Sequence, residues 1–125
     1  MIKAGIYRTV KSHVIFEKHG GANIKHEVYW NLCFYPHSKE VGLFGADKGF
    51  IQPYVNKSFD LKGEVSKSTD NFLELFILNP YTNLRKIYTG RIESDHLYLK
   101  YYHENKPEEV FEDVFEYIGT GESKA

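Results

Sequence analysis

The 125-residue sequence has one cysteine, no long apolar run and no leader-like N-terminus, and each absence excludes a class of protein. Cys33 cannot form a disulfide within the chain, and because it lies in an apolar run we interpret it as a small buried side chain. No stretch approaches the roughly 20 apolar residues of a transmembrane helix, and the first residues lack the apolar core of a signal peptide. We therefore expect a soluble, cytoplasmic protein without a membrane span.

An excess of charge of one sign is also lacking. The chain has 16 basic and 17 acidic residues, and its Lys and Arg residues form no run. Because a phosphate backbone is bound by dense positive charge, we expect no nucleic-acid partner. The six histidines match no zinc-binding spacing, and Gly20-Gly21 lacks the sequence context of a phosphate-binding loop. We therefore predict neither a metal nor a cofactor.

Aromatic side chains, in contrast, are abundant, with ten Tyr and nine Phe. They pack well in β-structure, and short apolar stretches closed by turn residues are typical of all-β domains. Residues 14–16 can continue the first strand, and the glycines in residues 19–23 suit a hairpin turn. We find no convincing helix. Strands are predicted at residues 5–10, 25–35, 40–45, 58–66, 71–78, 84–93, 97–103 and 109–118.

Most links between these segments are short, which suits antiparallel neighbours, since parallel strands need crossovers of about a dozen residues or more. We therefore predict a single all-β domain at residues 1–118, an antiparallel up-and-down β-barrel of about eight strands, with a β-sandwich as the alternative. Closure favours the barrel because it removes exposed sheet edges. Residues 46–57 are a candidate lid or crossing loop, and residues 119–125 a flexible tail.

Side-chain parity separates an inner from an outer face, because successive residues of a strand point to opposite sides. In residues 58–66, charged residues alternate with apolar ones, which places the apolar set inside. Gly63 and Gly90 also fall on the inner face, where a missing side chain permits either a sharper bend or open space. The predicted inner set is Tyr7, Thr9, His26, Val28, Trp30, Leu32, Phe34, Val41, Leu43, Phe59, Leu61, Tyr88, Ile92, Leu99, Tyr101, Phe111, Asp113, Phe115 and Tyr117.

Three features resemble the calycin group, which comprises the lipocalins and fatty-acid-binding proteins, and most closely its small lipocalin-like domains. Gly5-Ile6-Tyr7 is similar to the Gly-x-Trp of their first strand, the meander has the expected length, and "YTGRIESDHLYLKYY" is similar to their paired inner strands. The resemblance implies a barrel that holds a small hydrophobic ligand. Because the last strand lacks the Arg-x-Tyr with which fatty-acid-binding proteins hold a carboxylate, fatty-acid specificity is not implied.

The inner set predicts a ligand site, although a filled core remains the alternative. Asp113 is its most informative member, because a buried carboxylate needs a partner, and His26, Lys86 or a ligand hydroxyl can supply one. The other interpretation is that a strand bulge turns Asp113 outward, or that Asp113 forms a structural pair near the barrel rim. The predicted ligand-binding residues are Tyr7, His26, Trp30, Tyr88, Tyr101, Asp113 and Tyr117.

The leading hypothesis is non-catalytic binding of a small hydrophobic or aromatic ligand. An isomerase, cyclase or hydrolase that uses Asp113 or His26 as acid or base is a second hypothesis, which requires the two side chains to meet in one cavity. A third is a protein-interaction or inhibitor module, or a homodimer, that uses aromatic residues of the outer face. These outer aromatic residues are Tyr29, Tyr35, Phe72, Phe76, Tyr98 and Tyr102.

Overall fold

The computed structural model describes residues 2–46 and 61–119, in which every regular element is a β-strand. No helix that could cross a membrane is found in this part of the chain. The predicted loop at residues 46–57 lies outside the described residues except for Ala46, as does Phe59. The strands are β1 (Gly5–Thr9), β2 (His13–His19), β3 (Ala22–Phe34), β4 (Glu40–Ala46), β5 (Leu61–Ser68), β6 (Phe72–Asn79), β7 (Leu84–Glu93), β8 (His96–His103) and β9 (Phe111–Gly119).

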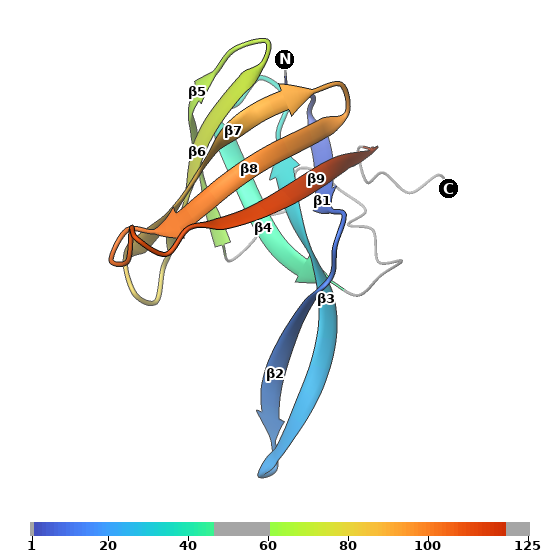
Figure 1. Ribbon diagram of the computed structural model, residues 1–125, viewed down its shortest axis with the longest axis vertical. Coiled ribbons are helices and arrows are strands. Elements are labelled where there is room, and N and C mark those ends of the chain that lie inside the picture. The colour runs from blue at the N-terminus through green and yellow to red at the C-terminus, as the bar shows by residue number, and fades with distance from the viewer. Residues whose placement is uncertain (1, 47–60, 120–125) are drawn as a thin grey trace.

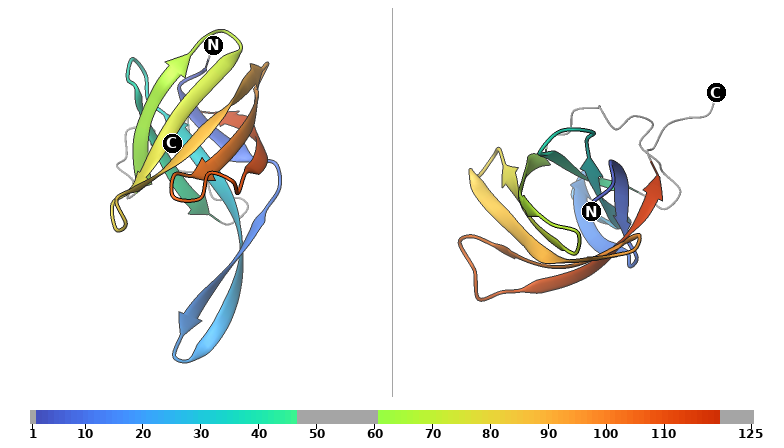
Figure 2. Two further views of the ribbon diagram at one scale, coloured as in Figure 1. Left: turned by 60° about the vertical axis from the view of Figure 1, so that its left-hand side comes forward. Right: turned by 90° about the horizontal axis from the view of Figure 1, so that it is seen from above.

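Eight of these strands, β1 and β3 to β9, form a closed antiparallel barrel. Each strand from β3 to β9 pairs with the next, and β1 closes the ring by pairing with both β9 and β3. Tyr7 marks this closure, because it lies opposite Leu32 on one side and Tyr117 on the other. The view along the barrel in Figure 2 shows the ring. The predicted all-β barrel is confirmed, and the chain does not form the alternative sandwich.

The extra strand, β2, corrects the predicted continuation of the first strand. Residues 13–19 form a strand of their own that pairs with the first half of β3, from His13 opposite Val28 to His19 opposite Ala22. This hairpin projects beyond the barrel (Figure 1). Its turn needs positive φ, which Gly20 and Gly21 adopt at 56° and 84°. The second half of β3 pairs with β1 and β4, so one strand of 13 residues serves both barrel and hairpin.

The inner face is apolar, as parity predicts, and core side chains fill much of it. Tyr7, whose ring meets Phe34 edge to face at a centroid distance of 5.6 Å, is fully buried. β9 ends at Gly119, one residue into the predicted tail. Cys33 is buried, and burial raises the pKa of its thiol to about 11, which agrees with an inert core residue. The buried core comprises Tyr7, Leu32, Phe34, Val41, Leu43, Leu73, Leu75, Ile77, Tyr88, Ile92, Leu97, Leu99, Tyr101 and Phe115.

The two inner glycines mark close approaches of neighbouring strands. A Cβ placed on Gly63 would lie 1.8 Å from the main-chain oxygen of Phe76, and one on Gly90 would lie 1.8 Å from that of Tyr98. No side chain fits at such distances, so glycine lets the neighbouring main chain approach closely there. Open space beside these glycines is therefore wrong, and the predicted sharper bend stays a prediction.

Candidate functional site

A hollow of about 520 Å³ lies at the barrel end that carries the β6–β7 and β8–β9 links. We call it the end hollow. Its walls are mostly apolar and come from strands on several sides of the ring, while polar groups stand at its rim. This is the usual make-up of a small-molecule site. Its lining residues are Trp30, Leu43, Leu61, Ile77, Asn79, Thr82, Leu84, Lys86, His103, Asn105, Lys106, Glu109 and Phe111.

Lys86 is the distinctive residue of the end hollow. It lies on the inner face of β7, two residues before Tyr88, and its Nζ faces three aromatic rings. The distances from Nζ to the ring centroids are 5.7 Å for Trp30, 5.2 Å for Tyr88 and 4.8 Å for Tyr101. Aromatic faces attract a cation electrostatically, so β3, β7 and β8 together form a cage for the ammonium group.

Lys86 nevertheless loses its proton more readily than an ordinary lysine. Burial lowers the pKa of Lys86 to about 8, and the negative charge of Asp113 opposes this shift. Among the described residues, no carboxylate lies within ion-pair distance of its Nζ. Lys86 is therefore a half-buried amine in an aromatic setting, with one compensating charge at longer range.

Asp113 lies beside this cage and is well hydrogen-bonded. The Tyr101 hydroxyl donates to its Oδ2 at 2.7 Å, and His13 Nε2 lies 3.0 Å from its Oδ1. Only 8% of the Asp113 side chain is exposed, so the outward-bulge interpretation is wrong. His13 begins β2, and sequence reasoning missed it because its approach to β9 depends on where the hairpin leaves the barrel.

Two tyrosine hydroxyls complete the polar part of the cage. Burial raises the pKa of Tyr88 well above its ordinary value, and the neighbouring Tyr101 and Asp113 add to the shift. Burial also raises the pKa of Tyr101, as does its hydrogen bond to Asp113. Both hydroxyls therefore stay protonated at neutral pH, and the Tyr101 hydroxyl donates its proton to Asp113.

The predicted site residues divide into two groups. Trp30, Tyr88, Tyr101 and Asp113 come together around Lys86, whereas Tyr7 and Tyr117 lie toward the opposite end. There the Tyr117 hydroxyl donates to the main-chain oxygen of Ala4 at 2.8 Å, and the Tyr7 hydroxyl accepts from the main-chain nitrogen of Lys3 at 3.1 Å. These two tyrosines fasten the N-terminal segment to the barrel.

The remaining predicted residue, His26, lies in the projecting hairpin opposite Ile15. The required pairing of His26 with Asp113 does not form, because the partners of Asp113 are Tyr101 and His13. An acid–base pair made of these two residues is therefore wrong. The predicted contribution of His26 to the inner face assumed that all of β3 belongs to the barrel, and its first half does not.

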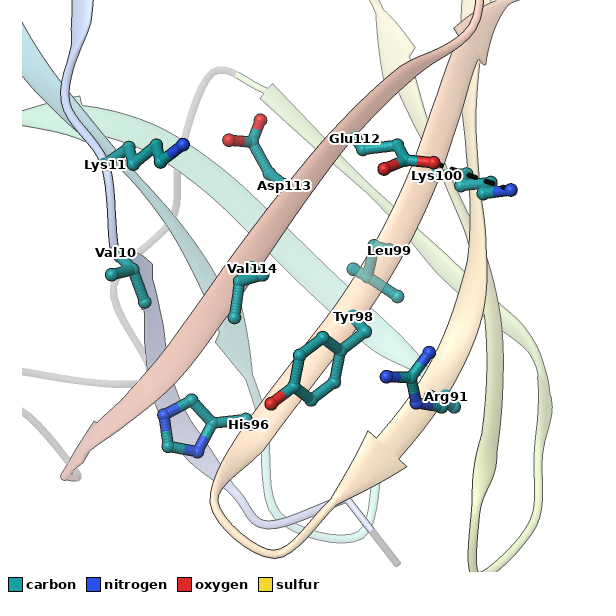
Figure 3. A pocket seen from close by; sticks show the side chains of 10 residues that line it. All are labelled: Val10, Lys11, Arg91, His96, Tyr98, Leu99, Lys100, Glu112, Asp113 and Val114. Atoms are coloured by element: carbon teal, nitrogen blue, oxygen red, sulfur yellow. Dashed lines mark ion pairs between the residues drawn. The ribbon is translucent and has the colours of Figure 1, made fainter.

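A second hollow, of about 660 Å³, lies on the outer face of β8 and β9 (Figure 3). Several of its charged side chains have partners: Lys100 lies 3.5 Å from Glu112, and Arg91 lies 3.0 Å from Glu93. The Arg91 guanidinium also covers the Tyr98 ring at 4.3 Å. We assign no site to this groove.

The outer aromatic rings do not form the bare patch that the sequence suggests. Cations lie over several of them, including Lys67 over Phe72 at 5.5 Å and Arg85 over Phe76 at 5.3 Å. Exposed apolar side chains gather instead on the hairpin, where Phe16 is 69% exposed. The interaction module and the homodimer stay predictions.

Within residues 2–46 and 61–119, no three His, Cys, Asp or Glu side chains come close enough to hold a metal ion. Comparisons with protein-family models, curated proteins and solved structures found no match. The resemblance to the calycin group stays a prediction, and the geometry of the end hollow is the basis for a functional proposal.

Proposed function

We propose that this protein binds a small, largely apolar molecule in the end hollow, between the aromatic cage of Lys86 and the rim at Phe111. The observation that carries the proposal is the hollow of about 520 Å³ itself, with Leu43, Leu61 and Ile77 along its walls. Volumes of this size are usual for small-ligand sites. The interior toward Tyr7 is filled by core side chains, so the ligand occupies one end of the barrel rather than its centre.

The affinity should be modest. A ligand that buries about 200 Å² of apolar surface gains roughly 5 kcal/mol, from which the cost of association is subtracted. Kd values of about a millimolar or weaker are therefore expected for probes without a specific polar contact. A polar group on the ligand that matches Lys86 or the two tyrosine hydroxyls would add both affinity and orientation.

Trp30 is the only tryptophan and lines the end hollow, so its fluorescence reports directly on occupancy. We would titrate the full chain with cuminyl alcohol and decanol, and follow Trp30 emission together with the melting temperature. Saturable changes in both support the proposal. If neither quantity changes across the panel, the proposal is wrong.

Phe111→Ala provides a matched test at the rim, because this ring stacks on Tyr101 at 5.5 Å and is 42% exposed. Its loss should weaken probe binding several-fold with little effect on folding. Val110→Ala is the control, since Val110 is similarly exposed and does not line the end hollow. Equal affinities of the two variants would place the ligand elsewhere.

A further inference from the structure

The surroundings of Lys86 favour a neutral ligand group over an acidic one. Asp113 on β9 already supplies the compensating negative charge, and a ligand carboxylate beside it would be repelled. The Tyr88 and Tyr101 hydroxyls are uncharged at neutral pH. The rest of the lining includes both basic and acidic side chains, namely His103, Lys106 and Glu109. His13 does not line the hollow and lies beside the Asp113 carboxylate.

We propose that Lys86 captures an apolar aldehyde or ketone in the end hollow by condensing with its carbonyl group to form an imine. This inference rests on the proposed function and names the ligand class of the same site. Three features of the geometry support it: an amine without an ion-pair partner among the described residues, an apolar hollow against it, and a carboxylate–tyrosine pair alongside.

The amine of Lys86 is unusually available as a nucleophile. Since burial lowers its pKa to about 8, at neutral pH it is neutral roughly 300 times more often than an amine at the ordinary value of 10.5. Desolvation of a lysine in an apolar pocket is a known way to activate it for attack on carbonyl carbon. The hollow adds proximity, because an apolar carbonyl compound concentrates there.

The condensation consumes no oxidant or reductant. The nitrogen lone pair of neutral Lys86 attacks the carbonyl carbon, a C–N bond forms, and the carbonyl π-electrons move to oxygen. One proton passes from nitrogen to this oxygen, with the nearby Asp113 carboxylate as the relay, and a neutral carbinolamine results. A second proton, taken from solvent, converts the hydroxyl group into water, which leaves as the nitrogen lone pair forms the C=N bond. The product is the protonated imine, and each imine releases one water molecule.

The cage also suits the product. A protonated imine carries its positive charge where the ammonium group carried it, over the rings of Trp30, Tyr88 and Tyr101. Asp113 remains its counter-charge. The groups that hold the free amine therefore need no rearrangement to hold the imine.

Reductive trapping with cuminaldehyde tests this inference. The full chain is incubated at neutral pH with the aldehyde and cyanoborohydride, and the modified lysines are identified by peptide mass spectrometry. We expect Lys86 to be labelled at least about tenfold faster at neutral pH than exposed lysines such as Lys100. Labelling spread evenly over the lysines would overturn the inference. This test needs only the wild-type protein.

Two variants refine the test. Lys86→Arg keeps a positive charge but cannot form the imine, so labelling at this site is lost, whereas Lys100→Arg leaves Lys86 labelling unchanged. Cuminyl alcohol separates the two proposals, because it fits the hollow and cannot condense. If Lys86 is not selectively labelled but the alcohol binds and changes Trp30 fluorescence, only the imine inference fails. If Lys86 is not selectively labelled and the alcohol leaves Trp30 fluorescence unchanged, both proposals fail.

Discussion

The two ends of the barrel are built from similar aromatic residues and treat them in opposite ways. Near the N-terminus, the Tyr7 and Tyr117 rings pack at a centroid distance of 5.0 Å, and their hydroxyls bond main-chain atoms of residues 3 and 4. At the other end, Tyr88 and Tyr101 surround an amine and a carboxylate beside a hollow. The first arrangement satisfies every hydroxyl through the fold itself. The second leaves the Lys86 amine facing the hollow beside the hydrogen-bonded pair of Asp113 and Tyr101, which costs stability and is typical of a functional site.

The largest effect should come from the filled end. Tyr7→Ala removes a fully buried ring and leaves a cavity among Phe34, Leu32 and Tyr117, so the free energy of unfolding should fall by about 3–5 kcal/mol. Urea denaturation measures this, with Phe111→Ala as the counterpart at the end hollow and an expected loss of roughly 1 kcal/mol or less. Similar losses for the two variants would contradict the difference between the ends.

The second effect concerns the close approach of β7 and β8 at Gly90. In Gly90→Ala the new methyl group meets the main-chain oxygen of Tyr98, so strands β7 and β8 must move apart. We expect the free energy of unfolding, measured in urea, to fall by about 2–3 kcal/mol. The control Thr89→Ala, at the preceding residue, should lower it by only about a few tenths of a kcal/mol. If Gly90→Ala is as stable as the wild type, the strands are not held as closely as described.

The third effect has the opposite sign. The pKa of Lys86 in the folded protein, about 8, lies below the ordinary 10.5, so the unfolded chain binds this proton more tightly. The folded state therefore loses stability as pH falls from about 10.5 to about 8, and the penalty is complete below that window. Lys86→Met should stabilise the protein at neutral pH by about 1–2 kcal/mol, and this gain should shrink as the pH rises from about 8 to about 10.5. If Lys86→Met instead lowers the free energy of unfolding by the same amount at every pH, this explanation is contradicted.

The smallest effect should come from a region outside both ends. Phe16→Ser on the hairpin replaces an exposed ring, so the free energy of unfolding should change by less than about 0.5 kcal/mol. Light scattering at high concentration is the informative measurement for the wild type and this variant. A dimer that Phe16→Ser dissociates would show that the hairpin is an interaction surface, and a monomer in both cases would remove the predicted homodimer through the outer aromatic residues.

Much of the barrel could be predicted because alternation along each strand reports directly on burial. The inner positions of β6 and β7 follow from parity alone, and Trp30, Tyr88, Tyr101 and Asp113 share the inner face as expected. The contrast between the two ends could not be predicted, because it depends on cross-strand register. Tyr88 faces Tyr101 across one pair, whereas Tyr7 meets Tyr117 only through closure of the ring.

His13 and Gly90 show two further limits. The contact between His13 and Asp113 joins residues 100 positions apart and depends on the hairpin leaving the barrel at β2. A glycine on an inner face signals that space matters, but a sequence does not reveal whether a void or another backbone occupies that space. Lys86 was visible as a partner for Asp113, yet its role as the centre of an aromatic cage required three strands to be placed together.

The most direct test of the central claim is a chemical-shift titration of the isotope-labelled protein with cuminyl alcohol. If the end hollow is the binding site, saturable shifts will be confined to Trp30, Lys86, Tyr101, Phe111 and their neighbours, and the resonances of Tyr7 and Tyr117 will stay in place. Shifts centred on Tyr7 and Tyr117, or on the outer groove at Tyr98, would contradict the claim that one end of the barrel is filled and the other binds.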